Sequence, residues 1–191
     1  MGSIYFTSDT HFGHTNIIKY CNRPFSDSKE MDEAMIANWN ARVRPNDQVY
    51  HLGDFGFGTE EQLNKILKRL NGKKYFIRGN HDKGIRGSVI NNFEWVKDYY
   101  ELNIEGQRMV LCHYPLVTWN KARRGAWMLH GHCHHTLDYM NEDTIRLDVG
   151  VDGFGFAPIS IPQIKNIMEK KTYKVVDHHG KDVDSTTMDE L

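Results

Sequence analysis

Five short hydrophobic runs in this chain each end in side chains that can bind a metal ion. The segments at these ends are Asp9-Thr10-His11, Gly53-Asp54, Gly79-Asn80-His81-Asp82, Cys112-His113 and Gly131-His132-Cys133-His134. They offer carboxylate oxygens, an amide oxygen and several imidazole nitrogens, a set that suits a pair of borderline or hard divalent ions. Two such ions side by side favour hydrolysis of phosphate esters, because they hold both the attacking and the leaving oxygen. The fold must therefore bring these run ends together.

The first half of the chain alternates short apolar runs with helical patterns. A capping-box pattern at Asp27 and Glu30 predicts a helix that runs to about Val43, and a second one at Thr59 and Gln62 predicts a helix that ends near Gly72. Strands are expected at residues 3–8, 48–52 and 74–78. The resulting β-α-β-α-β order is typical of a sheet with right-handed crossovers, and such sheets bind ligands at the carboxyl ends of their strands.

The second half has few helical patterns. Strands are expected at residues 94–104, 108–112, 126–130, 144–149 and 172–176, with one helix at 162–170. This contrast between the halves favours two facing sheets with helices outside. Residues 1–176 are expected to form a single domain, and the polar residues 177–191 a loose tail.

Composition limits the classes of partner. The chain has 191 residues, 39% of them hydrophobic and 26% charged, with a formal net charge of −1, so no strongly basic field indicates a dedicated nucleic-acid-binding protein. Three cysteines form no disulfide framework and fit a reducing compartment. The sequence shows no run of membrane-spanning length and no secretory signal. We therefore expect a cytoplasmic protein without a membrane partner.

The five segments, in their order, resemble the motifs of the calcineurin-like metallophosphoesterase superfamily. Those motifs run D-x-H, G-D, G-N-H-[DE], a lone His and G-H-x-H, and the resemblance extends from residue 4 to about residue 160. The chain looks most similar to the compact bacterial and viral phosphoesterases of that superfamily. The resemblance implies an α/β fold of two facing mixed β-sheets flanked by helices, in four α/β/β/α layers. It also implies two divalent metal ions, with manganese favoured and iron, nickel, cobalt, zinc or magnesium possible.

The resemblance also assigns the metal ligands. One ion is expected to bind Asp9, His11, Asp54 and His134, and the other Asp54, Asn80, His113 and His132. Asp54 is the best candidate for a bridging ligand, because its two carboxylate oxygens can each serve a different ion.

His81 is the expected catalytic residue. A histidine with a pKa near neutrality can protonate the leaving alkoxide while a metal-bridging hydroxide attacks phosphorus. In related enzymes an acidic residue soon after the G-D motif steadies this histidine, but residues 55–58 here contain no carboxylate. Asp82 or a backbone carbonyl is the expected substitute. His14 and Arg23 are candidate substrate-binding residues, since each can contact phosphate.

These observations predict a binuclear phosphoesterase that hydrolyses small phosphoesters, with nucleotide-like phosphodiesters favoured. A metal-dependent nuclease or a phosphomonoesterase is the alternative, so nucleic acid stays possible as a partner but is not favoured. An inactive scaffold of the same fold is less favoured, because such members generally lose ligands, and a one-metal zinc hydrolase is a further alternative. The sequence leaves the oligomeric state open.

Overall fold

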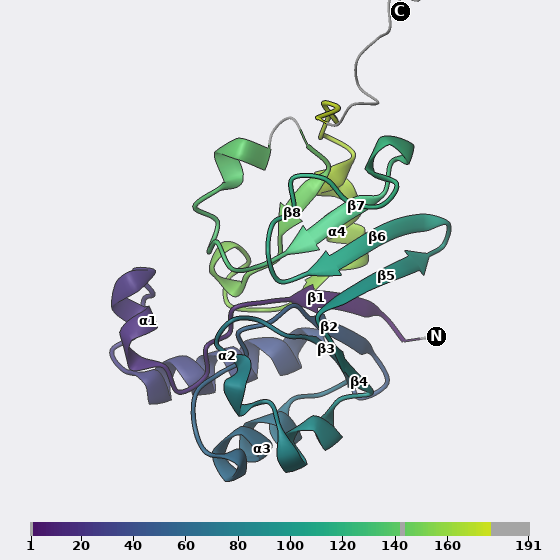
Figure 1. Ribbon diagram of the computed structural model, residues 1–191. Helices are drawn as coiled ribbons and strands as arrows, with labels where there is room; N and C mark the ends of the chain where they lie inside the picture. The colour runs from purple at the N-terminus through teal and green to yellow at the C-terminus, as the bar shows by residue number, and fades with distance from the viewer. Residues whose placement is uncertain (1, 142–143, 177–191) are drawn as a thin grey trace, which may run out of the picture.

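Two mixed β-sheets face each other in the computed structural model, which describes residues 2–141 and 144–176 (Figure 1). The first sheet has the strand order β4-β3-β2-β1-β9. Its strands are β1 (Ile4–Thr7), β2 (Gln48–His51), β3 (Lys73–Ile77), β4 (Trp95–Lys97) and β9 (Ile159–Ser160). The strands β1 to β4 run parallel and β9 pairs antiparallel with β1. The parallel strands therefore end at the same edge.

The second sheet has the order β5-β6-β7-β8. It consists of β5 (Tyr99–Ile104), β6 (Gln107–Cys112), β7 (Trp127–His130) and β8 (Arg146–Asp148). The strands β6, β7 and β8 are parallel, and β5 is antiparallel to β6.

The central core lies between the two sheets. Alternate residues of each strand point into it, as the two-residue period of a strand requires. Helix α4 (Ile161–Met168) adds two side chains to this core. The buried members are Phe6, Tyr50, Leu52, Ile77, Met109, Leu111, Leu129, Leu147, Val149, Ile159, Ile164 and Met168.

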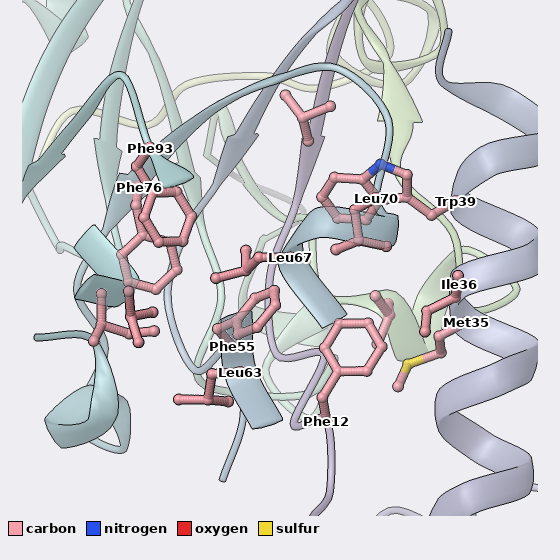
Figure 2. Packing of buried hydrophobic residues seen from close by; sticks show 14 of the residues in the cluster. Phe12, Met35, Ile36, Trp39, Phe55, Leu63, Leu67, Leu70, Phe76 and Phe93 are labelled. Carbon is pink, nitrogen blue, oxygen red and sulfur yellow. The ribbon is translucent and has the colours of Figure 1, made fainter. Parts of the chain in front are cut away.

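A second core lies on the outer face of the first sheet, beneath the helices α2 (Ser28–Arg42) and α3 (Glu60–Arg69) (Figure 2). The Asp27 side chain accepts a hydrogen bond from the Glu30 N–H, and Thr59 and Gln62 form the predicted capping box. Glu30 itself accepts from the backbone N–H of Ser26, so the predicted box at α2 is only half formed. Both helices begin at the predicted side chains because these local bonds satisfy free N–H groups of the first turn.

The outer face of the second sheet carries a smaller cluster, which includes Trp119, Ala122 and Met128. Trp119 donates a hydrogen bond from Nε1 to the Ala126 carbonyl at 2.7 Å. The short 3-10 helix η3 (Ala122–Arg124) lies in this cover. The expected fold class, two facing mixed sheets flanked by helices, is confirmed.

Two strand predictions were wrong. Residues 94–104 form two strands in different sheets, because the chain leaves β4 at Asp98 and enters β5 at Tyr99. Residues 172–176 form no strand, although Tyr173 packs on Trp119 with ring centroids 5.9 Å apart. Strand β9 and the short helix α1 (Thr15–Tyr20) were missed.

The remaining elements are short 3-10 helices in the loops. They are η1 (Asp82–Gly84), η2 (Gly87–Asn92), η4 (Asp138–Asn141) and η5 (Val151–Gly153). The tail predicted at residues 177–191 lies outside the described residues. Within the described ranges, no helix has the length and apolar character needed to cross a bilayer.

Candidate metal centre

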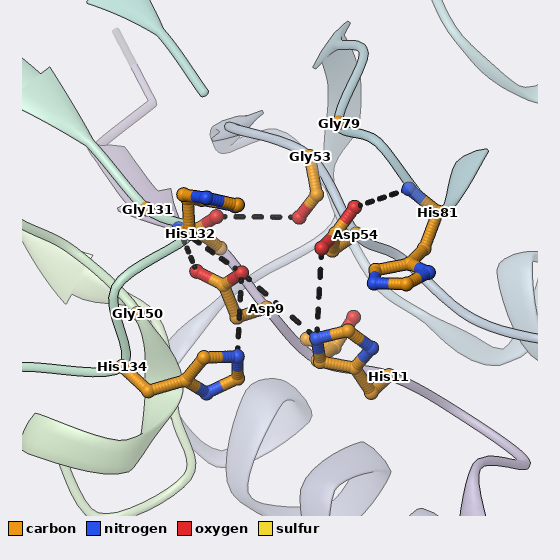
Figure 3. Close-up of polar contacts among 12 residues, drawn as sticks. Asp9, His11, Gly53, Asp54, Gly79, His81, Gly131, His132, His134 and Gly150 are labelled. Atoms are coloured by element: carbon orange, nitrogen blue, oxygen red, sulfur yellow. Dashed lines mark hydrogen bonds and ion pairs between the residues drawn. The ribbon is translucent and has the colours of Figure 1, made fainter. Parts of the chain in front are cut away.

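The carboxyl ends of β1, β2 and β3 in one sheet and of β6 and β7 in the other meet at one place. All seven predicted ligand residues follow these ends. The structure brings them into two neighbouring groups, and Figure 3 shows Asp9, His134, His11 and Asp54 side by side. His11 and His113 are buried, whereas His134 is half-buried and His132 is exposed. Loops at the carboxyl edge of parallel strands carry this site, as is usual for open α/β sheets.

The first group consists of Asp9, His11 and His134, whose potential ligand atoms lie within 4.8 Å of one another. The Nε2 atoms of His11 and His134 each lie 3.9 Å from Oδ1 of Asp9. Atoms at these separations can surround one ion, because a metal–nitrogen or metal–oxygen bond of about 2 Å places two ligand atoms about 3–4 Å apart.

The second group consists of Asp54, His113 and His132, again with potential ligand atoms within 4.8 Å of one another. The Nε2 atom of His113 lies 3.0 Å from Oδ1 of Asn80, so the amide oxygen belongs to the same group. Three of the four ligands in this group are neutral, namely two imidazoles and one amide, and its carboxylate is that of Asp54. The first group has a buried carboxylate of its own, that of Asp9.

Asp54 stands between the two groups. Its Oδ2 atom lies 3.7 Å from Nε2 of His11 and 3.5 Å from Nε2 of His113. Its other oxygen, Oδ1, accepts a hydrogen bond from the backbone N–H of His81 at 2.9 Å. The same oxygen, Oδ2, therefore faces a histidine of each group.

Five of these residues have a left-handed backbone, which is unusual for residues other than glycine. The φ values are 56° at Asp9, 50° at His11, 57° at Asp54, 70° at His132 and 47° at His134. Such a conformation costs about 1–2 kcal/mol per residue and persists only where the surrounding structure enforces it. The concentration of strain at these positions indicates a functional site.

Two glycines allow the backbone to pass close to the carboxylates. A Cβ atom on Gly79 would collide with the Asp54 carboxylate, and one on Gly131 would collide with the side chains of Ser8 and Asp9. Because Gly131 leaves this space open, the next N–H, that of His132, reaches Oδ2 of Asp9 at 3.0 Å.

The buried nitrogens of His11 test whether a metal fits here. Both Nδ1 and Nε2 of His11 are buried without a hydrogen-bond partner among the described residues. A buried polar group normally has a partner, because an unpaired one costs about 1–3 kcal/mol. An ion bound by Nε2, beside the carboxylates of Asp9 and Asp54, would give one of these two unpaired nitrogens a partner. The donor set therefore fits a divalent cation.

The pKa values of this centre reflect crowded, buried charge. Burial raises the pKa of Asp9 to about 7 and lowers that of His11 to about 2. Burial opposes charge on His134 too, but the hydrogen bonds to Asp152 and Cys21 and the nearby Asp9 charge raise its pKa to about 10. In the metal-free protein Asp9 and His134 therefore hold protons near neutral pH that a cation must displace, whereas His11 is already in the neutral form that binds a metal.

His81 lies at the exposed side of the centre. Its ring packs against Phe57 and His11, with ring centroids 5.5 Å and 5.7 Å away. The partly buried His14 ring also packs against Phe57, with ring centroids 4.3 Å apart. The geometry thus places His81 and His14 beside the first ligand group and leaves the His81 ring open to solvent.

Two of the sequence expectations do not match the structure. Arg23 is buried, and its guanidinium pairs with Asp152 and donates to main-chain carbonyls, so it is not available for substrate phosphate. Asp82 does not orient the His81 ring. Its carboxylate accepts the backbone N–H groups of Asp54, Phe55 and Gly79 at 2.6–2.9 Å.

Sequence reasoning missed two acidic residues at this edge. Asp152 binds Nδ1 of His134 through Oδ2 at 2.7 Å. The fully buried Asp148, at the end of β8, accepts the backbone N–H groups of His135 and Gly150 at 3.0 Å and 2.8 Å. A signal was present, because Asp148 lies near the end of the strand expected at residues 144–149 and Asp152 follows that strand, as the ligands follow theirs.

Comparisons with known proteins show what this chain is similar to. A family model described as calcineurin-like phosphoesterase superfamily domain matches residues 3–154. An uncharacterized protein of Methanocaldococcus jannaschii is 38% identical over 176 residues, which cover 89% of this chain and 93% of that protein. The gene 66 protein of Mycobacterium phage L5 is 26% identical, over 81% of this chain and 89% of that protein. The solved structure of a protein of unknown function from Aquifex aeolicus matches with a TM-score of 0.70 and 27% identity, over 87% of this chain and 100% of that one.

Proposed function

The chain belongs to the calcineurin-like phosphoesterase superfamily, and from this premise we propose that it is a binuclear metal-dependent hydrolase of small, nucleotide-like phosphodiesters. The observation that carries the proposal is the position of Asp54, whose Oδ2 atom lies 3.7 Å from a histidine of one ligand group and 3.5 Å from a histidine of the other. A carboxylate in this position suits two neighbouring cations.

The two ligand groups would each hold one divalent ion. Asp9, His11 and His134 would bind the first, Asn80, His113 and His132 the second, and Asp54 both. The mixed oxygen and nitrogen donors favour manganese, with iron, nickel, cobalt, zinc or magnesium as alternatives. When bound, such ions supply a nucleophile at neutral pH and neutralise charge on the phosphoryl oxygens.

The side chains of the protein supply the remaining steps. The exposed His81, fixed at its backbone by the Asp54 carboxylate, protonates the leaving oxygen. His14, next to Phe57, contacts a phosphoryl oxygen. Three oxygen ligands come from three different strand ends, and they would hold the ions on the side of the reacting phosphate. They are Asp9 after β1, Asp54 after β2 and Asn80 after β3.

The buried ion pair between Arg23 and Asp152 favours diesters over monoesters as substrates. A monoester carries about two negative charges near neutral pH, so it benefits from cationic side chains beyond the metals, whereas a diester carries about one. Because the Arg23 guanidinium is paired with Asp152 inside the protein, it does not supply this charge. A small diester is therefore the substrate class that fits best.

Metal removal and reconstitution test the proposal. The chelated protein should be inactive, and Mn²⁺ should restore hydrolysis of bis(p-nitrophenyl) phosphate with two ions bound per chain by elemental analysis. A panel that adds a cyclic nucleotide, p-nitrophenyl phosphate and a single-stranded oligonucleotide separates diesterase, monoesterase and nuclease activities. One bound ion would favour a mononuclear hydrolase, and two ions without any hydrolysis would favour a scaffold.

A further inference from the structure

A buried chain of three side chains connects the interior to the first ligand group. Arg23 donates from Nε to Oδ1 of Asp152 at 2.8 Å and from Nη2 to Oδ2 at 3.0 Å. Asp152 Oδ2 also accepts from Nδ1 of His134 at 2.7 Å. The two-point geometry between a guanidinium and a carboxylate is the strongest form of such a pair and fixes the carboxylate plane.

The position of the chain protects it from solvent. The Arg23 side chain is 0% exposed, that of Asp152 12% and that of His134 17%. Screening by water is weak at such burial, and a rigid hydrogen-bonded network can hold a ring in one orientation. With Nδ1 of His134 bound to Asp152, Nε2 is the nitrogen that faces Asp9, at 3.9 Å.

Arg23 also holds the main chain of a second ligand. Its Nη2 donates to the carbonyl of Asp9 at 2.7 Å, and its Nη1 donates to the carbonyl of Thr10 at 3.0 Å. Asp9 has a strained left-handed backbone, with φ at 56°. One guanidinium therefore fixes both the strained turn that carries Asp9 and the carboxylate that orients His134.

The second ligand group is supported in a different way. The Nδ1 atom of His113 donates to the backbone carbonyl of Leu52 at 2.8 Å. This contact belongs to the strand β2 region and involves neither Arg23 nor Asp152. Arg23 and Asp152 thus hydrogen-bond residues of the first ligand group directly, whereas the second group meets this network only through the N–H of His132, which donates to the Asp9 carboxylate at 3.0 Å.

We propose that Arg23 and Asp152 are positioning residues that set the affinity of the ion held by Asp9, His11 and His134, while the ion at His113 and His132 does not depend on them. The inference rests on the proposed binuclear function and adds which buried residues control which ion. Carboxylates that hydrogen-bond a ligating histidine fix its tautomer and orientation, and their loss typically weakens metal binding roughly 10–100-fold.

Asp152→Asn is the main test, because it keeps the shape of the side chain and removes its charge. Asp138→Asn is the matched control, since Asp138 forms a similar pair with Nδ1 of the neighbouring His135, at 2.9 Å, and His135 is not a proposed ligand. The metal-free proteins are titrated with Mn²⁺, and calorimetry and electron paramagnetic resonance monitor the titration. Together they measure the affinities of the two ions separately. The wild type should bind two ions as a coupled pair.

Asp152→Asn should keep one ion at wild-type affinity and bind the other roughly 10–100-fold more weakly, which leaves the spectrum of an isolated ion. Asp138→Asn should match the wild type. Equal weakening of both ions in Asp152→Asn, or no weakening, overturns the proposal. A wild type that binds fewer than two ions contradicts the binuclear function itself, and the inference falls with it.

Two further variants complete the test. Arg23→Lys keeps a buried positive charge but loses the two-point contact with Asp152, so it should weaken the binding of the same ion. This variant keeps the proposal testable if Asp152→Asn fails to fold. Cys21→Ala removes the other neighbour of His134 Nδ1, whose Sγ lies 3.3 Å away. It should change the affinity of the first ion less than Asp152→Asn does, and an equal or larger selective loss in this variant would assign the positioning role to the thiol.

Discussion

The carboxylate of Asp82 accepts the backbone N–H of Asp54 at 2.7 Å and so joins two of the loops that form the candidate metal centre. The same side chain accepts the N–H groups of Phe55 at 2.9 Å and Gly79 at 2.6 Å. Asp82 is only 3% exposed. The last residue of the G-N-H-D segment therefore fixes the turn that presents the proposed bridging ligand.

Replacement of Asp82 by alanine should destabilise the protein strongly. Three backbone donors would lose their acceptor, and each buried unsatisfied group costs about 1–3 kcal/mol, so the free energy of unfolding should fall by about 3 kcal/mol or more. Chemical denaturation of the metal-free protein measures this change. Asp27→Ala is the comparison, because Asp27 caps α2 through one N–H and should cost only about 1 kcal/mol. Similar losses in the two variants would contradict the structural role given to Asp82.

Replacement of Asp54 by alanine should remove at least one ion and nearly all activity. Its Oδ2 atom faces histidines of both ligand groups, and the substitution leaves neither group with this carboxylate. Metal content after dialysis and the turnover number with bis(p-nitrophenyl) phosphate provide the measurement. Near-normal turnover with two bound ions would show that the ligand assignment is wrong.

Replacement of His81 by alanine should spare metal binding and slow catalysis. The ring is exposed at the edge of the centre, and loss of a general acid typically lowers turnover roughly 10²–10⁴-fold for a poor leaving group. The loss should be small for p-nitrophenolate, which leaves without a proton. Comparison of an alkyl and a nitrophenyl diester tests the role. Equal losses with both would indicate that His81 binds phosphate and does not donate a proton.

Metal affinity should rise with pH. In the metal-free protein burial raises the pKa of Asp9 to about 7, and the pKa of His134 is about 10, so both groups carry protons below pH 7 that an ion must displace. Each displaced proton raises the apparent affinity roughly tenfold per pH unit. The dependence should therefore be steepest below pH 7 and become shallower above it, where Asp9 is already ionised. Calorimetry in buffers of different ionisation enthalpy counts the released protons, and an affinity that stays constant from pH 6 to 8 would contradict this account.

The helices and the strand ends could be predicted from the sequence because their determinants are local. The capping box of Thr59 and Gln62 spans four residues, and the apolar spacing that follows it repeats within a few turns. The proposed metal ligands follow the hydrophobic runs directly, so their place at strand ends was also readable from the sequence. Even here the left-handed turns at Asp9 and Asp54 were not foreseen, because those residues adopt them under tertiary constraint.

By itself, then, the sequence determined which side chains follow which strands and where the main helices begin. Only the tertiary structure decided that residues 94–104 divide between two sheets and that Arg23 pairs with Asp152 instead of meeting a substrate. The physical reason is distance along the chain. Sheet partners and buried ion pairs join residues far apart in sequence (129 positions for Arg23 and Asp152), and no local pattern records which distant group will compensate a buried charge.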